Sequence, residues 1–341
     1  MTVSIIVASY NFGRFLPQTL DSVLAQTFGD WECLVVDDGS TDDTADVAER
    51  YAQRDPRIRL LKLPHRGVSA TRNAGIRATK GELIQFLDAD DLLIPEKLEL
   101  QTRFLNEHPE CDVVYGNVAY FRTESPGTLM FSPRGRLSRP ILNDRLHGSE
   151  PALRKLELYN FFHPCAALAR RSVIERAGLF SETTRASEDH ELWLACAILG
   201  ARFDHLEREE PMAHIRSHRA SASREPGKIV RGLIEAATSF PGTPAGAAWP
   251  GPALPLIYEV AIGIRDGEEG HGLRAYRRIR GAARACPEAL TRLRWNVYAI
   301  AALLLPRRLF FRFAAMPIPE VALEAYRRLR RLVSGRARTS R

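Results

Sequence analysis

Residues 83–91 read Leu83-Ile84-Gln85-Phe86-Leu87-Asp88-Ala89-Asp90-Asp91, an apolar run that ends in clustered carboxylates. The same pattern occurs twice earlier, where residues 3–8 run into Ser9-Tyr10-Asn11 and residues 33–36 run into Asp37-Asp38-Gly39-Ser40. Each apolar run has the length of a β-strand. Carboxylates at the end of an apolar strand are costly unless a cation or a hydrogen-bond donor satisfies them. The pattern therefore predicts strands whose ends meet a polar ligand.

Strands and helices alternate outward from these runs to about residue 117. Two further apolar runs occupy Ile58 to Leu63 and Asp112 to Tyr115. Helical spacing or composition appears between the runs, at Leu16 to Leu24, Thr41 to Arg54 and Pro95 to Asn106. This alternation predicts an α/β fold of right-handed βαβ units, with a mostly parallel central sheet flanked by helices. In such sheets, ligands bind at the carboxyl ends of the strands.

The rest of the chain divides by composition. We expect residues 1–117 to bind a nucleotide, and residues 118–225 to complete the cleft on the acceptor side. Residues 239–255 are dense in Pro and Gly and predict a linker or an ordered loop. We expect residues 226–341 to form a C-terminal Arg-rich helical region.

Composition excludes several classes of protein. With 341 residues, 45% hydrophobic and 26% charged, the chain matches a globular protein and not a fibrous or disordered one. The formal net charge is +7, but the segment from His271 to Arg341 holds 17 Arg and only three acidic residues. The front of the chain is therefore acidic, and the basic tail is where an anionic surface would bind.

The cysteines and the N-terminus indicate a cytoplasmic protein. The five cysteines are an odd number without a C-x-x-C pair, which argues against a disulfide framework and a cysteine zinc site. Residues 1–11 carry no basic region before their short apolar run, so we interpret them as a first strand and not as a signal peptide. The longest uncharged apolar run, Trp295 to Pro306, is 12 residues long, whereas a spanning helix needs about 20.

Asp88 and Asp90 are the candidate metal ligands. Two residues apart on an extended strand end, they project to the same side, about 6 to 7 Å apart. Their oxygens favour Mg²⁺ or Mn²⁺, which usually keep substrate phosphate oxygens in their shell. The alternative is a solvated Asp-rich turn before the helix near Pro95, and Asp91 fits that alternative.

Asp38 and Tyr10 are the candidate base-binding residues. A carboxylate at the edge of the sheet can accept the N–H of a pyrimidine, and a tyrosine on the neighbouring strand end can stack on the ring. The alternative for Tyr10 is a core residue with a satisfied hydroxyl. Residues 40–43 are interpreted as structural, with Ser40 or Thr41 capping the following helix and two aspartates in its first turn.

Asp189 is the candidate general base, in a helix that opens at Ser187. The alternative is structural, since Ser187 is a good N-cap and acidic residues favour the first turn. The helix N-terminus would lower the pKa of Asp189 and burial near Trp193 would raise it. Further along, Arg216 and His218 could bind a diphosphate or complete a metal shell, with His205 and His214 as alternatives.

Taken together, these blocks resemble the family 2 inverting glycosyltransferases of the GT-A fold. The matching stretches come in the family's order, from residue 3 to about 223: residues 4–11 (SIIVASYN), 34–42 (LVVDDGSTD), 71–76 (TRNAGI), 86–91 (FLDADD), 188–193 (EDHELW) and 216–218 (RSH). Two departures are Ala8, where proline is common in the family, and the absence of a Gln-x-x-Arg-Trp element. The nearest match to that element, at residues 291–295, lacks the glutamine, which argues against a processive polysaccharide synthase.

The resemblance implies a role for each candidate residue. Tyr10 and Asp38 would hold the nucleobase, Asp88 would contact the ribose or a metal-bound water, and Asp90 would be the direct ligand of the Mg²⁺ or Mn²⁺ ion. Arg72, or alternatively Arg66, would lie near the nucleotide. Asp189 would be the catalytic base, and His218 would contact the metal or the diphosphate.

The implied activity is non-processive inverting transfer of a sugar from a nucleotide-diphosphate sugar to an acceptor hydroxyl. By resemblance the donor is a UDP-sugar, and the acceptor is a glycan or lipid-linked glycan of cell-surface polysaccharide or glycolipid synthesis. The rival is a catalytically silent nucleotide-sugar-binding or scaffold protein of the same fold. A pyrophosphorylase and a dehydrogenase are disfavoured because neither type of Gly-rich loop follows the first strand.

The basic tail suggests a second partner. Residues 303–313 (LLLPRRLFFRF) and 326–333 (YRRLRRLV) interleave Arg with apolar residues. Such segments bind anionic lipid surfaces, so we expect peripheral attachment to the inner face of the cell membrane. The alternative is an appendage packed on the catalytic domain or on a second subunit. No recognition motif for nucleic acid accompanies the charge.

Overall fold

The computed structural model describes residues 1–130, 146–160, 162–184, 186–218, 226–249, 254–269, 271–285, 296 and 299. They form two compact units. The first contains the described residues of 1–224 and 235–252, and the second contains residues 225–234 and those from 253 onward as far as they are described. All the candidate site residues belong to the first unit.

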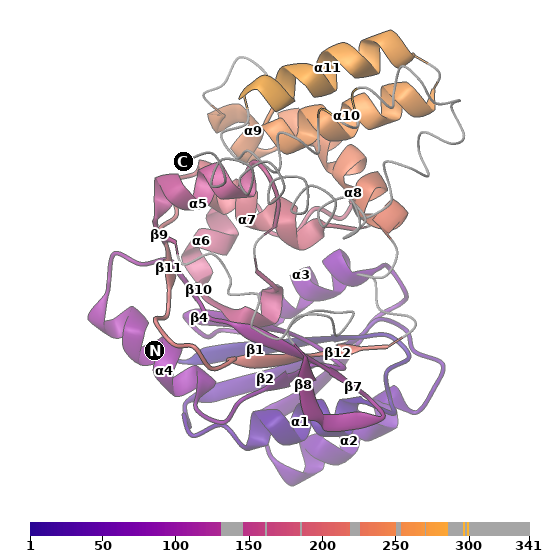
Figure 1. The fold of residues 1–341 in the computed structure, drawn as a ribbon. Coiled ribbons are helices and arrows are strands. Elements are labelled where there is room, and N and C mark those ends of the chain that lie inside the picture. The colour runs from indigo at the N-terminus through magenta and orange to yellow at the C-terminus, as the bar shows by residue number, and fades with distance from the viewer. Residues whose placement is uncertain are drawn as a thin grey trace, which may run out of the picture. The chain divides into compact units, whose positions relative to one another are not determined.

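An eight-stranded sheet forms the centre of the first unit, in the order β3-β2-β1-β4-β10-β6-β11-β9 (Figure 1). Its first four strands are parallel: β3 (Ile58–Lys62), β2 (Trp31–Asp37), β1 (Val3–Ser9) and β4 (Leu83–Asp88). The other four are β10 (Ala167–Arg170), β6 (Val113–Tyr115), β11 (Phe203–His205) and β9 (His147–Gly148). Only β10 and β9 run antiparallel to their neighbours, so the prediction of a mostly parallel sheet is confirmed.

Helices cover both faces of the parallel strands. Figure 1 shows α3 (Val68–Ala78) on one face and α1 (Leu16–Leu24) and α2 (Thr44–Arg54) on the other. Right-handed crossovers require this arrangement, because the chain moves outward from β1 to β3 and then returns to β4 on the other side of β1. Apolar side chains therefore point to both faces, and Val3 to Val7 are fully buried along β1.

The start of α2 differs from the prediction. The helix begins at Thr44 and not at Thr41, because Asp42 Oδ1 accepts the Thr44 N–H at 3.0 Å and holds the preceding residues in a turn. The predicted cap by Ser40 or Thr41 is wrong. Ser40 Oγ instead accepts the Asn11 N–H at 2.8 Å, which joins the end of β1 to the turn after β2.

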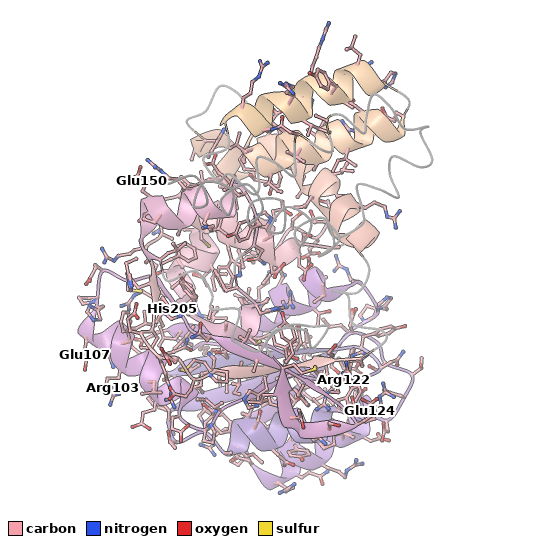
Figure 2. All side chains as sticks on the ribbon, viewed as in Figure 1. Arg103, Glu107, Arg122, Glu124, Glu150 and His205 are labelled. Atoms are coloured by element: carbon pink, nitrogen blue, oxygen red, sulfur yellow. The ribbon has the colours of Figure 1, made fainter. Side chains whose placement is uncertain are left out.

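The remaining elements of the first unit form a second sheet and further helices, and all of them except β5 and α4 come after residue 117. A second sheet has the order β5-β12-β7-β8, with β5 (Leu92–Leu93), β12 (Ala213–Ser217), β7 (Val118–Arg122) and β8 (Ser125–Met130). The helical segments are α4 (Lys97–Glu107), α5 (Ser149–Leu156), η1 (Pro164–Ala166), α6 (Arg171–Arg176) and α7 (Glu188–Ile198). Figure 2 shows the side chains on these elements. His205 is buried on β11, with Nε2 3.3 Å from Asn117 Oδ1, so it belongs to the core.

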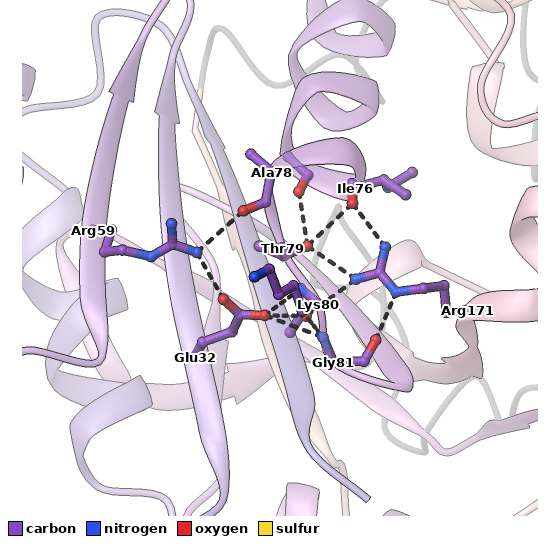
Figure 3. A network of polar contacts seen from close by, with 10 residues as sticks. Glu32, Arg59, Ile76, Ala78, Thr79, Lys80, Gly81 and Arg171 are labelled. Atoms are coloured by element: carbon purple, nitrogen blue, oxygen red, sulfur yellow. Dashed lines mark hydrogen bonds and ion pairs between the residues drawn. The ribbon is translucent and has the colours of Figure 1, made fainter.

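A polar network closes the end of the sheet where the parallel strands begin (Figure 3). Glu32 Oε1 accepts the N–H groups of Lys80 and Gly81, at 2.6 and 3.1 Å. Burial raises the pKa of Glu32, but these hydrogen bonds, together with those from the Ser4 and Arg59 side chains, outweigh that effect and lower it overall. Arg171 donates to the carbonyls of Ile76 and Gly81, at 2.7 Å each. The end of α3 is thus fixed to β2 and to the start of α6.

The Pro/Gly-rich stretch from residue 239 contains ordered structure. It holds η3 (Phe240–Gly242) and α9 (Pro244–Ala248), and the Thr243 side chain caps α9 by accepting the Gly246 N–H at 3.0 Å. Residues 235–252 belong to the first unit.

Two paired helices form the described core of the second unit, α10 (Leu256–Glu268) and α11 (Gly272–Ala285). A side chain at Gly263 would place Cβ 2.5 Å from Ile279 Cγ1, so glycine permits the close approach of the two helices. Helix α8 (Pro226–Ser239) is shared between the units. The two Arg-rich stretches predicted to bind membrane lie outside the described residues. Among the helices that are described, none combines the length and apolarity that crossing a bilayer requires.

Candidate active site

The carboxyl ends of three parallel strands bring the predicted residues to one edge of the sheet. In the register, Ser9 pairs with Asp37 and Ala8 pairs with Asp88. Tyr10, Asp38 and Asp90 follow these paired positions by one or two residues. The strand ends therefore converge as expected.

Asp38 is buried and holds the loop that precedes α3. Its two carboxylate oxygens accept the N–H groups of Arg66 and Gly67, at 2.8 and 2.9 Å. His65 Nδ1 lies 2.9 Å from Asp38 Oδ2. Gly39 makes this close packing possible, because its φ is 78° and a Cβ there would lie 2.9 Å from the backbone nitrogen of His65.

Tyr10 is exposed and stacks on His65. The ring centroids are 4.1 Å apart with an interplanar angle of 23°, and 40% of Tyr10 is exposed to solvent. His65 therefore connects Tyr10 with Asp38. The alternative of a core tyrosine is wrong, and no sequence pattern marked His65, a single histidine in a loop.

Arg72 is a buried cation between two carboxylates. Its Nη2 lies 2.7 Å from Asp88 Oδ1, and its Nη1 lies 2.7 Å from Glu188 Oε1. Burial alone would lower the pKa of Arg72, but Asp88 and Glu188 outweigh that effect and raise it. The guanidinium also lies over the Phe180 ring, 5.2 Å from its centroid. Arg72 therefore links the end of β4 to the start of α7.

Asp90 pairs with His218. His218 Nε2 lies 3.0 Å from Asp90 Oδ2, and the imidazole packs 5.4 Å from the Phe15 ring. Burial and the neighbouring Asp88 raise the pKa of Asp90 to about 6, although His218 opposes this shift. A divalent cation would relieve the repulsion between the two carboxylates. The available oxygen and imidazole donors therefore fit Mg²⁺ or Mn²⁺.

Asp91 and Arg216 support the turn that carries Asp90. Asp91 Oδ1 accepts the Arg216 N–H at 2.9 Å, and Arg216 Nε donates to the Asp90 carbonyl at 2.9 Å. The Arg216 guanidinium lies between the Phe15 and Phe121 rings, 4.6 and 4.3 Å from their centroids. Asp91 is therefore structural, but it is buried against β12, so the predicted solvated turn is wrong.

Asp189 lies in the first turn of α7. Its Oδ1 accepts the His190 N–H at 2.9 Å, and its Oδ2 accepts a hydrogen bond from Asn160 Nδ2 at 2.8 Å. Burial raises the pKa of Asp189 above its ordinary value, and Arg72 partly opposes this shift. Burial therefore outweighs the influences that lower the pKa. Such a shift suits a carboxylate that must accept a proton.

The start of α7 is held from outside the helix. Ser187 is the N-cap residue of α7, as predicted, but its backbone is left-handed with φ of 63° and its side chain makes no capping hydrogen bond. His190 is buried, and its Nε2 lies 2.7 Å from the Leu156 carbonyl at the end of α5. Burial lowers the pKa of His190 to about 4, so the neutral ring donates to that carbonyl.

The candidate residues form two connected groups on the strand-end edge. One contains Tyr10 and Asp38, joined through His65. The other runs from His218 and Asp90 to Asp88, Arg72 and Asp189. Sequence reasoning missed Glu188 and Asn160 in the second group. Glu188 lay inside a quoted motif, whereas no local pattern marked Asn160.

Comparisons with known proteins identify the family and the fold of the chain. A model of the family described as glycosyl transferase family 2 matches residues 4–178, just over half of the chain. The uncharacterized glycosyltransferase EpsJ of Bacillus subtilis is 32% identical over 188 residues, which cover 55% of this chain and 53% of EpsJ. An uncharacterized glycosyltransferase of Rickettsia typhi is 32% identical over 205 residues, which cover 60% of this chain and 61% of that protein. The matches thus span about half to three fifths of these relatives.

Solved structures share the fold at low sequence identity. Residues 1–349 of S. aureus TarS, in complex with UDP-GlcNAc, align with a TM-score of 0.60 and 18% identity, over 92% of this chain and 91% of that one. The mannosyltransferase PcManGT from Pyrobaculum calidifontis, in complex with GDP-Man and Mn²⁺, aligns with a TM-score of 0.53 and 20% identity, over 92% and 85%. The prediction of a GT-A fold is therefore confirmed.

Proposed function

Because the chain belongs to glycosyl transferase family 2, we propose that it transfers a sugar from a nucleotide-diphosphate sugar to an acceptor hydroxyl, with inversion at the anomeric carbon. The observation that carries this proposal is the path of contacts from Asp88 through Arg72 to Glu188, the neighbour of Asp189 on α7, with Asp90 two residues beyond Asp88. It connects a site for the leaving group to a candidate base.

Asp90 and Asp88 are proposed to hold the Mg²⁺ or Mn²⁺ ion, with His218 next to Asp90. A bound ion supplies positive charge that stabilises the departing diphosphate. The Mn²⁺ in the PcManGT complex supports a divalent ion at this position. Arg72 keeps Asp88 oriented from a position that solvent hardly reaches.

The nucleobase is proposed to bind at Tyr10 and Asp38. Tyr10 offers a ring face, and Asp38 fixes the backbone of residues 65–67 beside it. The UDP and UDP-GlcNAc complexes of TarS support a uridine donor, whereas the GDP-Man complex of PcManGT shows that the fold also accepts guanosine. We propose a UDP-sugar as the donor.

Asp189 is proposed to remove the proton from the acceptor hydroxyl. The acceptor oxygen forms a bond to the anomeric carbon as the bond from that carbon to the diphosphate oxygen breaks. The proton moves to Asp189, and the nucleoside diphosphate leaves with the electron pair. One displacement on the opposite face of the sugar gives inversion.

We further propose a glycan or lipid-linked glycan acceptor, in non-processive synthesis of cell-surface polysaccharide or glycolipid on the inner face of the membrane. The Arg-rich sequence of the tail supports attachment to anionic lipid. Sedimentation of the full chain with phosphatidylglycerol vesicles at low salt tests this part. Failure to sediment would contradict it.

Release of nucleoside diphosphate tests the proposed activity. UDP-glucose, UDP-GlcNAc and GDP-mannose are each incubated with the protein and MnCl₂, MgCl₂ or EDTA. We expect release from at least one donor with metal, and a loss of about 10²-fold or more in Asp90→Asn, since the metal supplies several kcal/mol to such reactions. Asp46→Asn, an exposed change on α2, is the matched control and should keep the rate. Metal-independent release, or no release, would contradict the proposal.

A further inference from the structure

Asn160 lies in the segment that follows α5, and the structure fixes that segment against α7. The Leu156 carbonyl at the end of α5 is held by His190, at 2.7 Å. Four residues later, Asn160 Nδ2 donates to Asp189 Oδ2 at 2.8 Å. Two successive side chains of α7, Asp189 and His190, therefore bind the same short segment. These two bonds hold Asn160 in place beside Asp189.

The other end of the Asn160 amide has an unused acceptor. Asn160 Oδ1 is buried, and the described residues offer it no hydrogen-bond partner. Its orientation is set by Asp189, because a carboxylate requires the NH₂ end of the amide. A buried carbonyl without a partner is costly, so such a group calls for a ligand that donates a hydrogen bond.

We propose that Asn160 is a positioning residue for the proposed transfer, and that it binds the acceptor through Oδ1 while it holds Asp189 through Nδ2. This inference rests on the proposed function. The acceptor then presents two neighbouring hydroxyls. One donates to Asp189 and attacks the sugar, and the other donates to Asn160 Oδ1. Neighbouring hydroxyls of this kind are typical of sugars and polyols.

Asn160 takes no proton in this scheme. The proton of the attacking hydroxyl moves to Asp189, while the amide donates one hydrogen bond and accepts another throughout. The Nδ2 bond stabilises the ionised form of Asp189 and so lowers its pKa. Loss of that bond should raise the pH at which the base becomes active.

The test is the pH profile of UDP release from UDP-GlcNAc with MnCl₂ and water as the acceptor. We expect the acid limb to move to higher pH in Asn160→Ala, and further, by about one pH unit or more, in Asn160→Asp, where a second carboxylate faces Asp189. Asn106→Ala, an exposed amide change on α4, is the control and should leave the profile unchanged. An unmoved acid limb in both Asn160 variants would overturn the inference, even if the rate or the stability fell.

The second arm measures stimulation of UDP release by methyl hexopyranosides and glycerol. In the wild-type protein we expect stimulation, and in Asn160→Ala a loss of about tenfold or more, the effect of one or two hydrogen bonds to a buried acceptor. Calorimetric affinity for UDP with Mn²⁺ should stay within about twofold of wild type. If no polyol stimulated UDP release by the wild-type protein, the proposed hydrogen bond from a second acceptor hydroxyl to Asn160 Oδ1 would be contradicted.

A double-mutant cycle separates this inference from the proposed function. The melting temperatures of Asn160→Ala, Asp189→Ala and the double variant are compared, since alanine at position 189 removes the acceptor of the Asn160 hydrogen bond. We expect the two single losses together to exceed the loss in the double variant, because both singles break the same bond. Additive losses would overturn the pairing. If the wild-type protein released no nucleoside diphosphate from any donor, the proposed function would fail, whatever the cycle showed.

Discussion

Residues 1–117, the proposed donor-side half, and the described residues of 118–225, the proposed acceptor-side half, position their side chains in different ways. In the donor-side half, six or seven consecutive residues pair between β1 and each of its neighbours, and Tyr10, Asp38 and Asp90 follow directly from these strands. In the acceptor-side half the strands are shorter, and Asp189 depends on single side-chain bonds from distant parts of the chain. In the first half, backbone hydrogen bonds between strands hold the site residues in place, so a single side-chain substitution does not displace them. In the second half, one substitution can remove the bond that positions Asp189.

The largest effect is expected where one buried side chain joins the two halves. Arg72→Met removes a guanidinium whose partners include Asp88 and Glu188 and leaves Glu188 as a buried unpaired charge. Breaking a buried pair in this way costs about 3 to 5 kcal/mol. We expect a loss of that size in the free energy of unfolding, measured by urea denaturation.

Arg66→Met is the matched change at an exposed pair. Arg66 lies 3.0 Å from Glu182, but 65% of its side chain is exposed, so the pair is worth about 1 kcal/mol or less. If Arg72→Met lowered the free energy of unfolding no more than Arg66→Met does, the Arg72 contacts between the two halves would not stabilise the protein.

The next effect separates stability from function. Arg171→Met removes the guanidinium that donates to the carbonyls of Ile76 and Gly81, at the end of the sheet opposite to the candidate site, and leaves Ile76 with only the longer bond from Thr79 at 3.4 Å. We expect a loss of about 2 to 3 kcal/mol in the free energy of unfolding. Calorimetric affinity for UDP with Mn²⁺ should remain unchanged in the folded protein, and a large loss of affinity would show that the two ends of the sheet are coupled.

Acid should weaken the acceptor-side half through His190. The folded pKa of about 4 lies below the ordinary value of 6.5, so the unfolded state binds more protons between these values. Stability is therefore full above pH 6.5 and is lost as pH falls toward 4, by up to about 3 kcal/mol. His190→Gln, which keeps a donor for the Leu156 carbonyl, should flatten the dependence of the unfolding free energy on pH between 4 and 7. An unchanged dependence would contradict this assignment.

The smallest effect concerns two left-handed residues, one in each half. Compared with Ser187→Ala, which removes the same hydroxyl, Ser187→Gly also removes the backbone strain before Asp189 and should have a free energy of unfolding higher by about 0 to 1 kcal/mol. Asn11→Gly should lower it slightly instead, because Asn11 Oδ1 accepts the Thr41 N–H at 2.8 Å. The measurement is thermal unfolding. If Asn11→Gly also raised the free energy of unfolding, the hydrogen bond from Thr41 to Asn11 would not stabilise the protein.

The two halves also differ in how far sequence could predict them. Apolar runs that end in aspartates predicted the parallel strands and the shared edge. This prediction was possible because parallel pairing places the ends of neighbouring strands side by side, so that residues at the same position in each run come together. The same reasoning missed His65 and Asn160, since their roles come from single contacts across 27 and 29 residues. The sequence predicted Ser187 as the N-cap residue of α7, but it did not predict the bonds of His190 and Arg72 that anchor this helix, because no local motif encodes them.

The most direct test of the account measures turnover and UDP affinity of Asp189→Asn side by side, with MnCl₂ and the donor that the wild-type protein uses. We predict that nucleoside diphosphate release falls by about 10² to 10⁴-fold while UDP binds as in the wild-type protein, because Asp189 serves the acceptor and not the nucleotide. Full turnover in a correctly folded Asp189→Asn protein would contradict the account.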